Sequence, residues 1–250
     1  MCKDTVQSVL KAFDYRIAYS PKGCITGLSF TEDVKLLVSI DDPVCFDVGA
    51  NEGQTIELFQ TVFKNPRIYA FEPSSETFGK LKLRNYGSHV SIHNFALGSK
   101  DSRQEFLNYE DPCFSSFLVM DPNPGNRFRG MRVKTSEAVD VRTIDHFIQQ
   151  NQVNRIDLLK IDTQGYDLKV LIGAADALER GLINNIFIEL NFDRFYRDQG
   201  DPRQISDLLA EHDFDLVDLY DKFRCGHRLE WCNALYSLRR LDGWFAREAR

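Results

Sequence analysis

The chain carries Asp47-Val48-Gly49-Ala50-Asn51-Glu52-Gly53 directly after the apolar run Val44-Cys45-Phe46. The apolar run predicts a buried strand that ends on an acidic residue, and the glycines predict a tight turn after it. Apolar side chains within residues 55–63 then fall on one face of a helix. A strand, a glycine-rich turn and a helix in this order are typical of the unit with which an open α/β sheet binds a cofactor.

A second acidic residue stands at the end of the next strand. The run Ile68-Tyr69-Ala70-Phe71 ends in Glu72, and Pro73 stops the strand. A carboxylate at this place can accept both ribose hydroxyls of an adenosine group. The alternative is that Asp47 and Glu72 only cap helices, but acidic residues at two successive strand ends favour a cofactor site.

The glycine turn favours a cofactor without phosphate groups. A dinucleotide fingerprint has three glycines, whereas this turn has only Gly49 and Gly53, so NAD is the less favoured ligand. A P-loop is excluded, since no Gly-Lys-Ser/Thr follows. S-adenosylmethionine fits better, because Asp47 can attract its ammonium group and the N–H groups of the turn can bind its carboxylate.

Strand and helix patterns alternate along most of the chain. Strands are predicted at residues 44–48, 68–71, 90–96, 156–162, 186–189, 214–220 and 234–238. Helices are predicted at residues 55–63, 75–85, 143–149 and 166–179, and a further one begins at Asp201-Pro202. The pattern predicts an α/β fold with a mostly parallel seven-stranded sheet, helices on both faces and an antiparallel hairpin at one edge.

The chain reads as one globular domain with two additions. Residues 1–43 form an N-terminal helical segment, with a helix near residues 5–15 and an apolar stretch at 34–40. The main domain spans residues 44–241. Within it, residues 103–140 form a β insertion, with short strands expected at 104–108, 117–120 and 133–141.

The composition restricts the partners and the compartment. A formal charge of −6 argues against nucleic acid and anionic membranes as main partners. No apolar run approaches the ~20 residues that a membrane span needs, and the N-terminus lacks a secretory signal. The six cysteines are scattered and form no CxxC pair, which favours reduced thiols and a cytoplasmic protein.

At this point the chain resembles the FkbM-type methyltransferase family. The resemblance rests on the motif around Gly49, on residues 69–73 and 94–98, and on the stretch Ile156-Asp157-Leu158-Leu159-Lys160-Ile161-Asp162-Thr163-Gln164-Gly165. It implies a Rossmann-like class I methyltransferase fold and S-adenosylmethionine as cofactor. It also implies methylation of a hydroxyl on a sugar, glycan or polyketide. Members often carry Glu where this chain has Gln164.

The resemblance and the strand ends together name the expected site residues. The expected cofactor contacts are Asp47, Gly49, Asn51, Gly53, Glu72, Ala96, Ser116 and Asp162. The expected catalytic residues are Asp162, Lys160 and Glu189. Asp162 stands at a strand tip and is a candidate general base for removing the acceptor's proton.

Two alternatives concern this catalytic set. Lys160 lies inside a buried strand, so it forms either a structural ion pair or a functional lysine of lowered pKa. Asp162, Glu189 and Asn191 could hold Mg²⁺ with hard oxygen ligands, a possibility that is not favoured over a metal-free site. Most histidines are expected to be structural or solvated, with His227 as an alternative base.

The insertion is expected to serve the acceptor. Arg127, Arg129 and Arg132 surround Phe128 and make a local positive patch on an acidic chain. They form either a solvated hairpin rim or a lid that meets an anionic or saccharide acceptor. The leading function is O-methylation of a small molecule or saccharide; the alternatives are N-methylation and a non-enzymatic S-adenosylmethionine-binding scaffold. The oligomeric state stays open.

Overall fold

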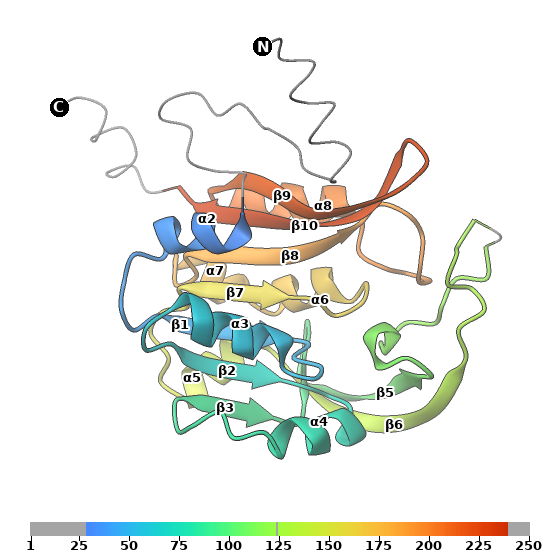
Figure 1. Ribbon diagram of the computed structural model, residues 1–250, viewed down its shortest axis with the longest axis horizontal. Helices are drawn as coiled ribbons and strands as arrows, with labels where there is room; N and C mark the ends of the chain where they lie inside the picture. The colour runs from blue at the N-terminus through green and yellow to red at the C-terminus, as the bar shows by residue number, and fades with distance from the viewer. Residues whose placement is uncertain (1–28, 124, 240–250) are drawn as a thin grey trace, which may run out of the picture.

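The computed structural model describes residues 29–123 and 125–239, so the helix expected near residues 5–15 lies outside the described residues. Seven strands form the central sheet in the order β3-β2-β1-β7-β8-β10-β9 (Figure 1). They are β1 (Val44–Val48), β2 (Arg67–Phe71), β3 (Val90–His93), β7 (Leu158–Ile161), β8 (Asn185–Asn191), β9 (Phe214–Cys225) and β10 (Arg228–Leu238). Strands β3, β2, β1, β7 and β8 pair in parallel, and β10 is antiparallel to both of its neighbours. This confirms the predicted mostly parallel sheet with an antiparallel hairpin at one edge.

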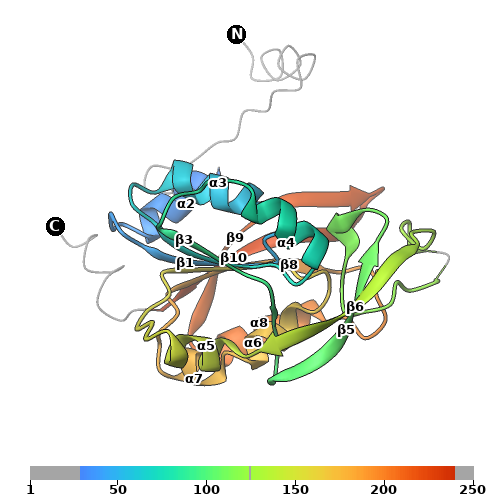
Figure 2. The same ribbon diagram turned by 90° about the horizontal axis from the view of Figure 1, so that it is seen from below.

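Helices cover both faces of the sheet (Figure 2). One face carries α2 (Phe30–Leu37), α3 (Gln54–Val62) and α4 (Ser75–Lys82); the other carries α5 (Ile144–Gln150), α6 (Asp167–Ile172), α7 (Ala175–Glu179) and α8 (Pro202–Glu211). Cys45 and Phe46 are both fully buried although successive strand residues point to opposite faces. Burial on both faces explains why the strand is a continuous apolar run.

Helix α2 belongs to the same core. Phe30 stacks on Phe187 of β8 with ring centroids 4.0 Å apart, and Val34 is fully buried. The end of the N-terminal segment therefore packs directly on the central sheet. None of the helices within the described ranges is long and apolar enough to cross a membrane.

The insertion builds a second, smaller sheet. Its order is β4-β6-β5, with β4 (Ala96–Leu97), β5 (Ser102–Tyr109) and β6 (Val133–Arg142), and the short 3₁₀ helix η1 (Pro112–Phe114) follows β5. This sheet lies beside the carboxyl ends of the central strands (Figure 1). It therefore stands at the edge where a parallel sheet binds ligands.

Three predicted elements are wrong in detail. The strand expected at residues 90–96 divides, because β3 ends at His93 and Ala96 pairs with β6 in the other sheet. Between the two, the Asn94 side chain donates to the backbone oxygens of Glu72 and Pro73 at 3.0 Å. This contact holds the chain in a bend where it leaves the central sheet.

In place of the strand expected at residues 117–120, the chain forms a single isolated bridge there, between Met120 and Tyr196. Side chains bind the amides of this segment in place of a neighbouring strand: Leu118 N donates to Ser116 Oγ, and Met120 N donates to the Tyr109 hydroxyl. A segment whose amides are already bound in this way cannot extend a ladder.

The helix expected at residues 166–179 is two helices, α6 and α7. The Asp145 carboxylate accepts from the amides of Asp176 and Ala177 at 2.9 Å and so starts α7 afresh. At the break, a Cβ on Gly173 would lie 1.9 Å from the Gly98 oxygen. The close backbone contact explains the glycine.

Candidate functional site

The turn after β1 brings two strand ends into backbone contact. Gly49 has φ +82°, and a Cβ there would lie 2.0 Å from the backbone oxygen of Asp162 at the end of β7. Asn51 follows with φ +46°. Gly53 serves packing instead, because a Cβ there would meet the Tyr86 hydroxyl at 2.1 Å. The expected cofactor contacts at Gly49 and Asn51 line a pocket, whereas Gly53 lies outside its lining.

Glu72 is held at the end of β2 by backbone amides. Asn51 N donates to Oε2 at 2.8 Å, and Ser74 N donates to Oε1 at 2.9 Å. Burial raises the pKa of Glu72 to about 7, although both amides act to lower it. A carboxylate oxygen can accept two hydrogen bonds, so each oxygen keeps an acceptor position for a ligand hydroxyl.

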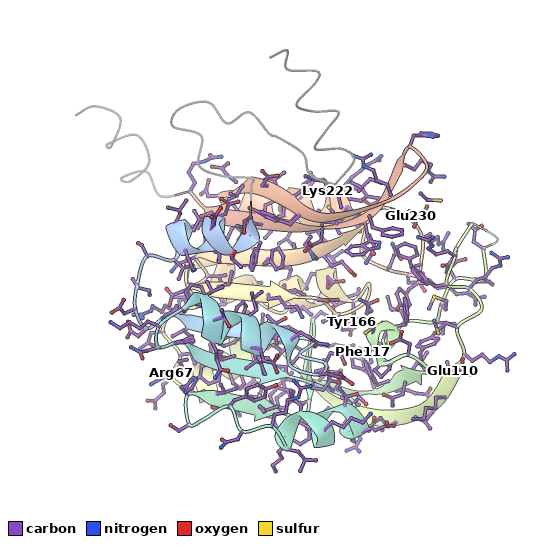
Figure 3. The ribbon with its side chains drawn as sticks, in the orientation of Figure 1. Arg67, Glu110, Phe117, Tyr166, Lys222 and Glu230 are labelled. Atoms are coloured by element: carbon purple, nitrogen blue, oxygen red, sulfur yellow. The ribbon has the colours of Figure 1, made fainter. Side chains whose placement is uncertain are left out.

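The pocket beside Glu72 has an empty volume of about 770 Å³ including its open mouth. Both sheets build it: its lining includes Val48, Gly49, Asn51, Glu72, Ala96, Leu97, Cys113, Phe117, Asp162, Gln164 and Tyr166. Figure 3 shows Phe117 and Tyr166 side by side at this edge, with ring centroids 4.8 Å apart. Mostly apolar walls with a few placed polar groups are typical of a cofactor site.

Ser116 supports this pocket from behind. Its side chain is fully buried, donates to the Gln164 oxygen at 2.9 Å and accepts from Leu118 N. Its neighbour Ser115 lines the pocket. The expected contact of Ser116 with the cofactor is therefore replaced by a structural role.

Lys160 and Asp47 form a buried ion pair beneath the glycine turn. The Lys160 ammonium lies 3.1 Å from Asp47 Oδ1, outside hydrogen-bond geometry, and donates to the Gly49 oxygen at 2.9 Å. Burial lowers the pKa of Lys160, but Asp47 and Asp162 outweigh it and leave the pKa above its usual value. Lys160 therefore lies in a buried ion pair as a cation. The alternative, a functional lysine of lowered pKa, does not fit the raised pKa.

Asp47 does not reach the pocket. Its side chain is fully buried, and burial raises its pKa while Lys160 offsets part of that rise. The expected contact with the cofactor's ammonium is thus replaced by an internal contact with Lys160. Through that lysine, Asp47 fixes the Gly49 oxygen and the shape of the turn.

Gln164 connects the two remaining catalytic candidates. Its Nε2 donates to Asp162 Oδ1 at 2.9 Å and to Glu189 Oε2 at 3.4 Å. Asp162 lines the pocket with a side chain 40% exposed, whereas Glu189 lies deeper, with Asn191 donating to its Oε2 at 2.9 Å. Burial and the neighbouring Asp162 and Asp167 raise the pKa of Glu189 well above its usual range.

This arrangement does not suit a magnesium ion at Asp162, Glu189 and Asn191, the possibility that the sequence left open without favouring it. Both carboxylates accept from the N–H₂ group of Gln164. A cation shared by the two would need oxygen ligands, whereas the group between them is a hydrogen-bond donor. Across the ranges that the structure describes, no three His, Cys, Asp or Glu side chains are grouped to hold a metal ion.

Asp167 is a site residue that sequence reasoning missed. Its Oδ1 accepts from Thr163 N and Thr163 Oγ1, and its Oδ2 accepts from Gly165 N. Burial raises the pKa of Asp167 to about 6. It fixes the loop between β7 and α6; an acidic residue in the first turn of a helix was the only signal for it.

The arginine patch in the insertion is partly engaged inside the protein. Arg127 lies 3.3 Å from the buried Glu230 of β10, and its guanidinium stands 4.6 Å from the centroid of the Phe223 ring. Figure 3 shows Glu230 on the strand that faces the insertion. Arg127 therefore fastens the insertion to the hairpin, which differs from both alternatives drawn from the sequence, a solvated rim and a lid over the acceptor.

None of the histidines in the described residues lines the pocket. His93 stacks on Phe71 with centroids 5.3 Å apart, and burial lowers its pKa. His227 lies in the exposed turn between β9 and β10.

Comparisons with known proteins find methyltransferases. The chain is 24% identical over 173 residues to the hexuronic acid methyltransferase AglP of Haloferax volcanii, covering 68% of this chain and 63% of that protein's length. It is 22% identical over 200 residues to the 2-O-methyltransferase NoeI of Sinorhizobium fredii, covering 77% and 80%. Among solved structures, an rRNA methylase from Streptococcus thermophilus matches with TM-score 0.46 and 11% identity, covering 90% of this chain and 100% of that one.

The family model of the methyltransferase FkbM domain matches residues 47–216. The match includes the glycine turn, Glu72, the insertion and the polar strand ends. The chain therefore belongs to the FkbM methyltransferase family.

Proposed function

We propose that this protein is an S-adenosylmethionine-dependent methyltransferase that methylates a hydroxyl group of a sugar or glycan. The observation that carries the proposal is Glu72, which two backbone amides hold at the wall of a pocket with free acceptor positions. Its geometry fits a pair of ribose hydroxyls, and the turn lacks the third glycine of a dinucleotide site.

Some residues of this chain would bind the cofactor, and another would take up the proton of the acceptor. Bound S-adenosylmethionine supplies an activated methyl group. Glu72 binds the ribose, the amides of the turn after Gly49 bind the carboxylate, and Ala96 and Phe117 enclose the base. Asp162 is exposed to the pocket and accepts the proton of the acceptor's hydroxyl.

A saccharide acceptor is favoured by two relatives. One is a hexuronic acid methyltransferase and the other a 2-O-methyltransferase. The exposed Arg132 and Arg197 are cations that could bind an acidic sugar. N-methylation is the second candidate; it would not need Asp162 as a base once the amine is neutral, so pH dependence separates the two.

The test is calorimetric titration with S-adenosylmethionine, S-adenosylhomocysteine and NAD in parallel. We expect binding of the two adenosyl compounds and none of NAD. Glu72→Ala should weaken S-adenosylhomocysteine binding roughly 10- to 100-fold, since a hydrogen bond to a charged group contributes about 1.5–3 kcal/mol. Glu76→Ala is the matched control, because Glu76 is exposed on α4 and pairs with Lys80 and Lys134. Equal affinities in both variants would show that Glu72 does not hold the ribose.

A further inference from the structure

Gln164 adopts a backbone conformation that residues other than glycine rarely take. It has φ +55°, in the left-handed region that favours glycine, and it stands in the loop after β7. Such strain at a strand end persists only where the surroundings fix the residue, and it is common at functional sites. The side chain of Gln164 is fixed at both of its polar atoms.

The orientation of the amide follows from the two carboxylates. Asp162 and Glu189 both need donors, so Nε2 faces them and Oε1 faces away. The hydroxyl of Tyr196, which is 1% exposed, lies 3.1 Å from Gln164 Oε1 and 2.9 Å from the Phe114 oxygen. The reverse orientation would point an oxygen at two carboxylates.

The charges around this amide are unbalanced. Carboxyl groups come from Asp47 on β1, Asp162 and Asp167 at the end of β7 and the start of α6, and Glu189 on β8. Tyr196 adds a neutral phenol and Cys232 of β10 adds a thiol; burial and Glu189 raise the pKa of both. The facing cation is Lys160, which lies 3.1 Å from Asp47 and 3.8 Å from Asp162. One cation does not offset this many carboxyl groups, so ionisation of the buried Glu189 beside the others is disfavoured.

We propose that Gln164 is a positioning residue whose neutral amide holds Asp162 and a protonated Glu189 as a pair. Glu189, the deeper member, carries the proton, and Asp162 is the member that lines the pocket. The role of this pair in methyl transfer rests on the proposed function. The neutral amide matters because an acid at position 164 would add a third carboxyl group to the pair.

The test is the pH dependence of unfolding of the full chain between pH 5 and 8. Glu189→Gln removes the proton that the folded state retains. The unfolding equilibrium constant of the wild type, relative to this variant, should therefore rise about tenfold per pH unit above pH 5. A ratio that stays constant would show that Glu189 is ionised and would overturn the proposal.

Gln164→Glu tests the amide directly. The new carboxyl group should keep a further proton in the folded state. The unfolding equilibrium constant of this variant should therefore be near that of the wild type at pH 5. Relative to the wild type, it should then rise about tenfold per pH unit. A pH dependence equal to that of the wild type would show that a carboxylate is accommodated at this position, and would overturn the role of the neutral amide.

Gln152→Glu is the matched control. Gln152 also has a positive φ, +53°, but it is exposed at the end of α5, so a carboxylate there stays in water. Its unfolding curve should therefore stay parallel to that of the wild type across the pH range. A wild-type protein that binds no S-adenosylhomocysteine would overturn the proposed function and leave these curves interpretable, so the two failures are distinguishable.

Discussion

Glu72 owes its chemistry to the backbone amides that hold it in a buried place. Burial raises its pKa to about 7, close to neutrality, and the amides of Asn51 and Ser74 keep both oxygens in position. Asp47 carries the same functional group but does not line the pocket, because it lies beneath the turn against Lys160. Position on the strand therefore does not determine what a carboxylate does; its donors and burial do.

The raised pKa of Glu72 makes cofactor binding depend on pH. Hydroxyl donors favour the ionised carboxylate, so the bound state has a lower pKa than the free state. Affinity for S-adenosylhomocysteine should then increase by up to about tenfold per pH unit as the pH rises toward 7, and should level off above 7. Calorimetry at pH 6 in two buffers of different ionisation enthalpy should report release of a proton.

Glu72→Gln provides the contrast, because an amide keeps the shape and cannot titrate. Its affinity should be weaker and flat between pH 5.5 and 7.5. A wild-type affinity that is equally flat would mean that Glu72 is already ionised throughout this range.

Residue-scale prediction from the sequence succeeds where strand ends meet and fails where loops meet. Gly49, Glu72 and Asp162 could be placed together because parallel strands bring their carboxyl ends to one edge. Tyr196 and Gln164 could not be paired, since they lie 32 positions apart on two loops whose approach depends on packing. Nothing local in either loop encodes that contact.

At the scale of elements, the insertion is fastened to the domain at two points. Near its base, Glu137 of β6 accepts from the amide of Ser75 at the start of α4 and from Asn108 of β5. At its tip, Arg127 meets Glu230 and the Phe223 ring. The insertion is therefore a fixed wall of the pocket, which its composition of loop-forming residues did not predict.

Loss of the tip contact should destabilise the protein measurably. Arg127→Ala leaves the buried Glu230 carboxylate without its cation, and we expect a loss of about 1–3 kcal/mol in the free energy of unfolding. Chemical denaturation measures this loss. Arg103→Ala is the control in the same insertion: its pair with Asp140 is exposed, so its effect should stay within about 0.5 kcal/mol.

A double-mutant cycle with Glu230→Gln decides whether the two side chains act together. The combined variant should lose less than the sum of the single variants, because the amide no longer needs a cation. Strict additivity would show that Arg127 acts through the Phe223 ring alone.

At the scale of elements, most strands and caps could be predicted because their signals are local. Thr143 accepts from His146 N and Asp201 accepts from Arg203 N, as helix caps should. The division between β3 and β4 depends on the Asn94 side chain and on a partner strand 45 positions away in the smaller sheet. Hydrophobic periodicity carries no information about such a partner.

The whole molecule places its pocket between two sheets. One wall comes from the carboxyl ends of β1, β2 and β7, and the other comes from β4, η1 and the segment after it. A ligand that contacts both walls must bind the central sheet and the insertion at once. Binding should therefore stabilise segments that are far apart in the sequence.

Hydrogen exchange tests this arrangement directly. Saturating S-adenosylhomocysteine should slow amide exchange at residues 49–53, 112–117 and 162–166, because all three segments contribute to the pocket lining. Helix α5 covers the face of the sheet opposite α3 and contributes nothing to the pocket lining, so its amides should exchange as in the free protein. Protection of residues 49–53 without protection of 112–117 would mean that the insertion does not close over the ligand, and the wall opposite Glu72 would then have to be supplied by the acceptor. Protection of all three segments would instead make the insertion part of the cofactor site, and would explain why one tip arginine is used to hold it in place.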